Sequence, residues 1–213
     1  GISVFVVDAK SSGINYEVLK TIASDKQCEV VLNNVRVPKS SILGQVDKGW
    51  PIVDQALRRG AVGKCAEMVG NSQQVLEMAV EYAKNRVQFG RPIGKFQAIQ
   101  QDLAVLSTHV AASSVAADYA CSSMDKGNPD FAIAVAKSRI DDAISVGAGI
   151  AHQVHGAIGF TYEHGLHFAT RRLWAWRAEY GSGSEWSKVL GEKAISNGAD
   201  KFWPSITQGD LDI

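Results

Sequence analysis

The sequence predicts a mainly α-helical protein, an up-and-down four-helix bundle preceded by a short β segment from an incomplete β domain. From Gly49 almost to the end of the chain, apolar residues recur close to the 3.6-residue period of a helix. Short turn-forming stretches such as DKGNPD separate the periodic segments. Roughly the first 45 residues instead contain β-branched and aromatic runs that are typical of strands.

The β segment contains at least two predicted strands. Residues 2–7 form the first, and QCEVVLNNVRVP contains the second, which ends at Pro38. Two strands are too few to cover a sheet. We therefore expect residues 1–47 to be the end of a larger β domain and residues 48–213 to form the helical bundle.

The helical part contains three long predicted helices and two shorter segments. The long helices are expected over residues 50–89, 96–124 and 129–155. The shorter segments lie on either side of a glycine-serine turn at residues 181–184. Three glycines interrupt the first helix, each at a cost of up to about 1 kcal/mol against alanine. They predict the close approach of another helix or a ligand at Gly60, Gly63 and Gly70.

The composition argues against several classes of partner. Lys and Arg together number 22, as do Asp and Glu, so no net field attracts nucleic acid or an anionic membrane. The three cysteines, Cys28, Cys65 and Cys121, lie far apart without the spacing of a zinc site or a disulfide framework. No run approaches the roughly 18 apolar residues of a membrane span. We expect a cytoplasmic protein, or one of the mitochondrial matrix in a eukaryote.

The segment NRVQFGRPIGKFQAIQ, residues 85–100, joins the first two helices and carries the densest set of binding groups. Its guanidinium forks and side-chain amides suit a phosphate group, and the ring of Phe89 offers a face to a base. The composition alone is compatible with a nucleotide-binding loop and with an ordinary connection that carries solvated cations.

The spacing within this segment resembles the R-x-x-F-G-x-x-[IL]-x-x-x-Q signature of the acyl-CoA dehydrogenase family. Three further segments resemble the family in the same order. GISVFVVD and CEVVLNNVRVPKSSILGQVDKGW match the end of its middle β domain, and AHQVHGAIGFTYEHGLHFATRR matches its Q-x-x-G-G-x-G-[FY]-[TS] segment. The resemblance implies an oxidoreductase acting on CH–CH donors, with FAD held across a subunit interface. It also implies an acyl-CoA substrate, electron-transfer flavoprotein as electron acceptor, a role in fatty acid metabolism, and self-association as a dimer or tetramer.

The resemblance also assigns residues to the FAD site. Arg86 and Phe89 match the residues that reach the pyrophosphate and adenine of the neighbouring subunit's FAD. One departure is Ala157, which stands where a second glycine is usual. The remaining expected contacts lie in the same loop, in the later glycine segment and in the glycine-serine turn: Gln88, Gln97, Gln153, Gly156, Ser182 and Ser184.

The position of the catalytic base is a larger departure. The family's usual Glu stands in a Y-E-G-T turn before the last helix, and counting from GFT places Tyr180 there. A tyrosine, with an ordinary pKa near 10, is a poor base at neutral pH. A second family position, on the first bundle helix, matches Gly60. Glu179 is a nearby acid, but one residue along a helix turns a side chain by about 100°, so the base is unassigned.

Three functions stay open. The chain is a C-terminal fragment of an FAD-dependent acyl-CoA dehydrogenase, which introduces an α,β-double bond into a thioester and takes its base from an unusual position. Alternatively, it is a non-catalytic subunit that completes the FAD site of a paralogous, active subunit. A third alternative is a flavin-dependent oxygenase relative, whose chemistry needs no carboxylate.

No metal is expected. His152 and His155 lie three residues apart on one helical face, which would suit two metal ligands, but no third ligand is near in sequence. We expect both rings to serve packing or polar contacts.

Overall fold

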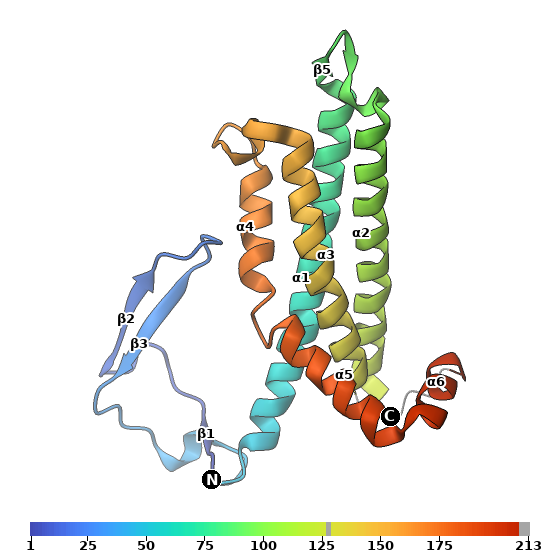
Figure 1. The fold of residues 1–213 in the computed structure, drawn as a ribbon. Coiled ribbons are helices and arrows are strands. Elements are labelled where there is room, and N and C mark those ends of the chain that lie inside the picture. The colour runs from blue at the N-terminus through green and yellow to red at the C-terminus, as the bar shows by residue number, and fades with distance from the viewer. Residues whose placement is uncertain (127–128, 209–213) are drawn as a thin grey trace. The chain divides into compact units, whose positions relative to one another are not determined.

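The structure, a computed structural model, describes residues 1–126 and 129–208 and confirms the mainly helical fold (Figure 1). The chain divides into two compact units, Gly1–Arg59 and Gly60–Ile213, and the boundary falls within the first long helix. Within the described ranges, no helix combines the length and the apolar character needed to cross a membrane.

The first unit contains two short antiparallel pairs. Strand β1 (Val4–Phe5) pairs with β4 (Ile42–Leu43), and β2 (Ile14–Leu19) pairs with β3 (Gln27–Leu32). The predicted first strand is therefore shorter than the apolar run over residues 2–7. Every residue of β3 is exposed despite its alternating pattern, because the two-stranded hairpin has no layer of its own unit packed on it.

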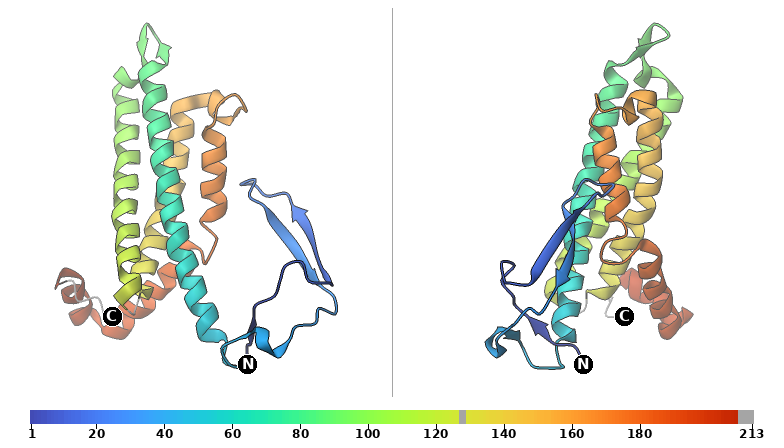
Figure 2. Two further views of the ribbon diagram at one scale, coloured as in Figure 1. Left: turned by 180° about the vertical axis from the view of Figure 1, so that it is seen from behind. Right: turned by 90° about the vertical axis from the view of Figure 1, so that its left-hand side faces the viewer.

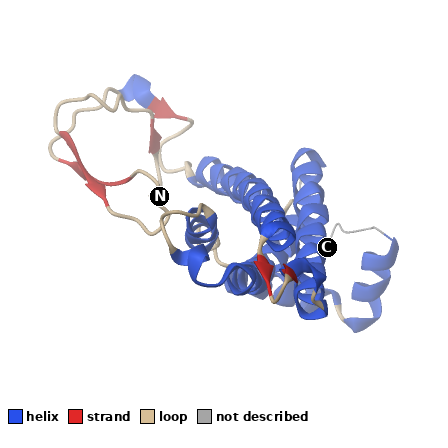
Figure 3. Cartoon of the chain, turned by 90° about the horizontal axis from the view of Figure 1, so that it is seen from above, coloured by secondary structure: helices blue, strands red, loops and turns tan. Residues whose placement is uncertain are grey.

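The second unit is built from helices that run up and down the bundle (Figures 1 and 2). Helix α4 runs upright beside α3, and after the turn at residues 177–182 helix α5 runs obliquely across the lower end of α3 (Figure 1). Seen from above, the long helices surround a common centre (Figure 3). The helices are α1 (Trp50–Asn85), α2 (Gln97–Ser123), α3 (Asp130–His155), α4 (Leu166–Trp176), α5 (Gly183–Asn197) and α6 (Ala199–Gln208).

Helix α1 ends at Asn85, four residues before the predicted end, because the chain turns into a hairpin. Strands β5 (Val87–Gln88) and β6 (Arg91–Pro92) pair there. The two residues between them, Phe89 and Gly90, have φ angles of 53° and 78°. Two successive positive φ angles are typical of the tight turns that close two-residue hairpins.

The core of the bundle is rich in small side chains, which let the helices approach closely. Ala61, Cys65 and Ala79 of α1 are fully buried. A Cβ atom on Gly147 of α3 would lie 2.9 Å from Cδ1 of Leu106 on α2. Of the three glycines in α1, Gly60 has a close neighbour, the ring of Tyr180, which comes from a turn and not from another helix or a ligand. At Gly63 and Gly70 a Cβ atom would meet nothing within 4 Å in the described part of this chain, so the close approach of a helix or a ligand stays a prediction there.

Four histidines, His152, His155, His164 and His167, form a histidine cluster at the end of α3. The ring of His155 stacks on Tyr82 of α1 with centroids 4.5 Å apart, and its centroid lies 4.6 Å from that of His164. His155 Nδ1 donates to the carbonyl of Ala151, one turn earlier in α3. The cluster thereby ties the last turns of α1 and α3 to the loop before α4.

Lowering the pH from 7.5 to 5.5 is expected to destabilise the bundle. Burial is the main cause that lowers the pKa of His155 below its ordinary value of 6.5. Its buried Nε2 has no hydrogen-bond partner among the described residues, so an added proton finds no acceptor. The unfolded chain binds this proton more readily. Stability is therefore complete above about pH 6.5 and is lost as the pH falls below it.

The free energy of urea unfolding, measured across this pH range, checks the expectation. His155→Phe keeps the stacking ring and removes the titration. The substitution should reduce the pH dependence of the free energy of unfolding by up to about 1.4 kcal/mol per pH unit, which corresponds to one proton. Tyr162→Phe is the matched control, because it changes a ring 4.9 Å from His167 and removes no histidine. A slope that is unaltered in His155→Phe contradicts the assignment.

Candidate cofactor and substrate site

The predicted site residues gather at the two ends of the bundle. Arg86 directly follows the C-terminal end of α1. Tyr180 packs against Gly60, which lies near the other end of α1. At 1.5 Å per residue, the helix between Gly60 and Asn85 is about 38 Å long. One chain therefore presents two separate sets of groups, which cannot both contact one small ligand within that chain.

The first set surrounds the β5–β6 hairpin. The Arg86 amide donates to the carbonyl of Tyr82, and the Arg86 carbonyl accepts from Ile93, which fixes the base of the hairpin. The Arg86 side chain is exposed, and Phe89 at the tip is 92% exposed. Gln88 is also exposed. The hairpin thus presents a guanidinium, an amide and an aromatic face outward from a rigid turn.

The residues expected from the later glycine segment lie at the same end, because Tyr82 and His155 stack there. Gln153 in α3 and Gln97 at the start of α2 are exposed. Gly156 caps α3 with φ 65° and ψ −145°, a conformation that favours glycine, and a Cβ atom there would meet nothing within 4 Å. The set of exposed donors, amides and one ring fits the pyrophosphate and adenine of a dinucleotide.

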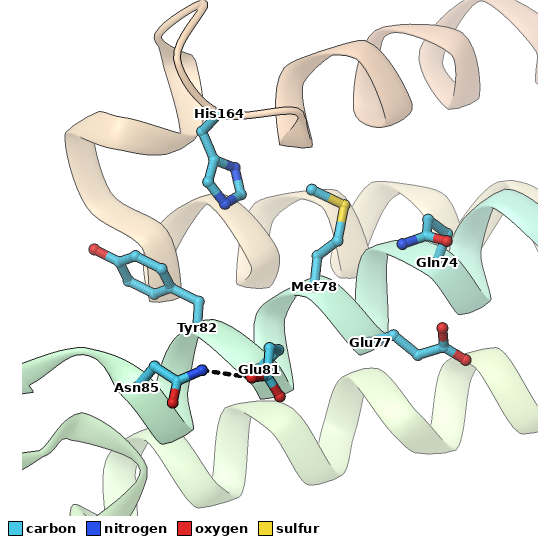
Figure 4. A pocket seen from close by; sticks show the side chains of 7 residues that line it. All are labelled: Gln74, Glu77, Met78, Glu81, Tyr82, Asn85 and His164. Atoms are coloured by element: carbon cyan, nitrogen blue, oxygen red, sulfur yellow. Dashed lines mark hydrogen bonds between the residues drawn. The ribbon is translucent and has the colours of Figure 1, made fainter.

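A cavity of about 490 Å³ lies beside this end, on the surface of α1 (Figure 4). Glu81 accepts a hydrogen bond from Asn85 there, as the dashed line in Figure 4 shows. None of the predicted site residues lines the cavity. Its lining is Gln74, Glu77, Met78, Glu81, Tyr82, Asn85 and His164.

The second set centres on Tyr180. Its φ angle is 56°, uncommon for a residue other than glycine. A Cβ atom on Gly60 would lie 2.3 Å from Cε1 of the Tyr180 ring, so the ring lies directly on the glycine. The structure therefore brings the two predicted base positions together, and a phenol occupies the space in which either carboxylate would stand. The Tyr180 side chain is still 45% exposed.

Glu179, the remaining acidic candidate, is held in an ion pair. Its carboxylate lies 3.1 Å from Nζ of Lys64, which also contacts Glu67 at 2.5 Å. The Lys64 ammonium lies 4.6 Å from the ring centroid of Trp176. Burial opposes the charge on Lys64, but hydrogen bonds to Glu67 and Glu179 outweigh it and raise its pKa. This charge network anchors Glu179 beside Tyr180.

Ser182 begins α5 in a capping box. Its hydroxyl accepts from the Glu185 amide at 3.3 Å, and its own amide donates to the Glu185 carboxylate at 2.7 Å. The Ser184 hydroxyl lies 3.0 Å from that of Ser182. Hydrogen bonds from Ser182 lower the pKa of Glu185. The capping box therefore already uses the Ser182 groups that were expected to meet a phosphate.

Lys137 is a residue at this end that the sequence reasoning missed. It is 1% exposed, and its Nζ donates to the carbonyls of Glu179 at 2.7 Å and Arg177 at 3.2 Å. Burial lowers its pKa. The sequence does hold a signal, since Lys137 falls in the apolar stripe of α3 between Ile133 and Ile140, both fully buried.

The side chains of the histidine cluster contact aromatic rings, a hydroxyl and a backbone carbonyl. His152 Nε2 lies 2.9 Å from the Thr170 hydroxyl, and its ring stacks on Phe160. In the ranges 1–126 and 129–208, no three His, Cys, Asp or Glu side chains are grouped so that they could hold a metal ion.

Comparisons with known proteins agree with this architecture. A family model described as the acyl-CoA dehydrogenase C-terminal domain matches residues 47–184. The 3-(aryl)acrylate reductase of Clostridium sporogenes is 36% identical over 77% of this chain and 45% of its own length. Subunit CarC of the caffeyl-CoA reductase-Etf complex of Acetobacterium woodii is 33% identical over 77% of this chain and 44% of its own.

Among solved structures, a glutaryl-coenzyme A dehydrogenase in complex with glutaryl-CoA superposes with a TM-score of 0.85 at 30% identity. It covers 90% of this chain, which in turn covers 50% of it. The chain thus spans less than half the length of the two curated relatives. The family model covers more than half of the chain, and it agrees with both the relatives and the fold, so the chain belongs to the acyl-CoA dehydrogenase family.

Proposed function

We propose that this chain is part of a flavin-dependent oxidoreductase that acts on the Cα–Cβ bond of an acyl-CoA thioester, with FAD as cofactor. The observation that carries the proposal is the placement of the family's motif residues in two sets, one at each end of a single bundle. Arg86 and Phe89 are exposed at one end, and Tyr180 lies on Gly60 at the other. Such an arrangement suits a cofactor shared between subunits.

Each chain would contribute to two cofactor sites. Arg86 and Gln88 would hold the pyrophosphate, Phe89 would lie against the adenine, and Gln97, Gln153 and Gly156 would complete that end. When bound, the flavin would supply the two-electron chemistry at Cβ. Self-association as a dimer or tetramer follows from this sharing. Electron-transfer flavoprotein is the expected redox partner, and one relative is named as a subunit of an Etf complex.

Tyr180 would then face the substrate's Cα. A phenol ordinarily keeps its proton at neutral pH, so it can donate a proton far more readily than accept one. This favours reduction of an α,β-unsaturated thioester, in which Tyr180 donates the proton to Cα. Two relatives named as reductases support this direction. The Gly60 position leaves room for the ring that performs this step.

The alternative is a non-catalytic subunit that completes the FAD site of a paralogous, active subunit. It is favoured by one observation: neither of the two base positions, Gly60 and Tyr180, carries a carboxylate, whereas the cofactor-facing residues are present. The choice between these two functions turns on whether the protein alone exchanges electrons with a thioester.

Anaerobic spectroscopy of the purified full-length protein tests the proposal. Mixing the reduced holoprotein with a panel of enoyl-CoA thioesters, aryl-acrylyl thioesters included, should restore the absorbance of oxidised flavin. Mixing the oxidised holoprotein with acyl-CoAs should bleach it more slowly. Activity that appears only when a paralogous subunit is added supports the non-catalytic function. Flavin that is reoxidised only by oxygen, with no thioester reacting, contradicts both.

Two substitutions at Tyr180 separate proton donation from proton removal. Tyr180→Phe keeps the ring on Gly60 and removes the proton, so thioester reduction should fall by about 100-fold or more. Tyr180→Glu introduces the missing carboxylate and should raise the rate of acyl-CoA oxidation by a similar factor. Stopped-flow flavin absorbance measures both rates. Tyr16→Phe is the matched control for loss of a hydroxyl, and equal losses in the two Phe variants would contradict the assignment.

Two arginines of the hairpin provide a matched pair for cofactor binding. Arg86→Ala should weaken FAD binding about tenfold or more, because it removes charge-assisted hydrogen bonds to phosphate. Arg91→Ala is the control, since the Arg91 guanidinium lies over the Phe96 ring at 4.2 Å and is engaged within its own chain. Titration of the apoprotein with FAD, followed by flavin fluorescence, gives both affinities. A larger loss in Arg91→Ala contradicts the role of Arg86.

A further inference from the structure

We propose that Lys137 is a positioning residue that fixes the turn carrying Tyr180 and so sets where the Tyr180 hydroxyl stands. The effect on chemistry rests on the proposed function, whereas the effect on the turn does not. Lys137 comes from α3, a helix that contributes none of the groups expected to meet the substrate. It acts on the reactive end of the site only through backbone carbonyls.

The Lys137 ammonium group lies at the C-terminal end of a helix. Helix α4 ends at Trp176, and the carbonyls at a helix end lack partners within the helix. Lys137 Nζ donates to two carbonyls just beyond this end, those of Arg177 and Glu179. A cation is also favoured at the negative end of the helix dipole. Lys137 therefore holds the chain where it leaves α4.

Glu179 is bound by lysines of two different helices. Lys137 of α3 binds its carbonyl at 2.7 Å, and Lys64 of α1 binds its carboxylate at 3.1 Å. The next residue, Tyr180, has a φ angle of 56°, in the left-handed region that side chains other than glycine rarely adopt. Such a conformation persists only where the surroundings impose it, and the two lysines lie at that point.

The turn determines where Tyr180 lies. Directly after residue 179, the Tyr180 ring lies on Gly60 and the Tyr180 carbonyl accepts from Nε1 of Trp186 at 3.0 Å. A shift of residues 177–179 would therefore move both the phenol and the contact with Trp186. The position of the hydroxyl depends on a lysine that it does not touch.

Loss of the Lys137 ammonium should affect the turn more than the stability of the bundle. Replacing the ammonium with an apolar side chain of similar length removes the cost of burying a charge and leaves two carbonyls without their donor. Arg177 and Glu179 are only half-buried, so these carbonyls can reach water if the turn shifts. Lys137 lies beside the buried thiol of Cys65, and the charges of Asp141, Glu179 and Lys64 also act on its ammonium. We therefore expect Lys137→Met to spare the fold and to loosen the turn.

Hydrogen exchange of the full-length protein, followed by mass spectrometry, tests the inference without requiring turnover. In Lys137→Met, amides of residues 177–186 should exchange at least tenfold faster, while those of α2 remain unchanged and the melting temperature stays within a few degrees. The matched control is Lys188→Met, because the Lys188 side chain is 79% exposed and pairs with Glu192 in its own helix. Unchanged exchange in the turn, or faster exchange throughout the bundle, overturns the proposal.

A measurement on the unaltered protein covers the case in which Lys137→Met does not fold. The nuclear magnetic resonance signal of the Trp186 indole N–H reports its bond to Tyr180. As the pH rises towards 10.5, loss of the Lys137 proton should shift this signal, because burial lowers the Lys137 pKa. Lys64, Asp141, Glu179 and Cys65 face the same ammonium, and Glu185 lies close enough for its carboxylate to interact with the Lys137 charge. Burial raises the pKa of Cys65 to about 11, and phenols ordinarily titrate near 10. The titration is therefore repeated in Cys65→Ala and in Tyr180→Phe, and the shift should persist in both variants. A signal that stays constant while the bundle remains folded overturns the proposal.

Kinetics then links the turn to the chemistry. If the protein turns over thioesters, Lys137→Met should lower kcat with little change in KM, and it should have no further effect in a Tyr180→Phe background. Equal losses in both backgrounds overturn the link to Tyr180. If no variant turns over any thioester, the proposed function fails, and the exchange experiment still decides whether Lys137 fixes the turn.

Discussion

The bundle depends on the turn that joins α4 to α5. Helices α1, α2 and α3 are long, whereas α4 is short and changes direction into α5 at a turn of residues 177–182 (Figure 1). The Arg177 guanidinium binds Asp141 of α3 through two hydrogen bonds of 2.5 and 2.9 Å. A Cβ atom on Gly183 would lie 2.5 Å from that of Asp141. Asp141 of α3 thus binds the chain before the turn and is packed closely by Gly183 after it, and Tyr180 lies between these two contacts.

The two ends of the bundle are built on different physical principles. The hairpin end is held by aromatic stacking between Tyr82 and the histidine cluster, and it presents its binding groups outward on a short, rigid turn. The turn end is held by charge, with lysines on α1 and α3 closing on Glu179. A rigid exposed tip suits recognition of a partner or a shared cofactor, because little conformational entropy is lost on binding. A turn held by two lysines suits the positioning of one hydroxyl, that of Tyr180.

Much of this architecture could be predicted from the sequence, because helical periodicity and motif order are local signals. The long helices lie within a few residues of their expected bounds, and Arg86 and Phe89 lie on the expected loop. No packing neighbour in the described part of this chain lies within 4 Å of a Cβ placed on Gly63 or Gly70, and a glycine in a helix does not reveal what faces it. Lys137 was missed for a related reason. Its partners are backbone carbonyls some forty residues away, which no pattern of side chains records.

The contact between Tyr180 and Gly60 also constrains how such a chain can change over time. With the ring in place, even the methyl group of an alanine at position 60 would overlap it. A carboxylate could enter at position 60 only after residue 180 had become smaller, whereas a carboxylate at position 180 needs no prior change elsewhere. The residue type that fits at position 60 therefore depends on the residue at position 180. While residue 180 is a tyrosine, position 60 accepts only glycine, so an acid can be introduced by a single substitution at position 180 but not at position 60.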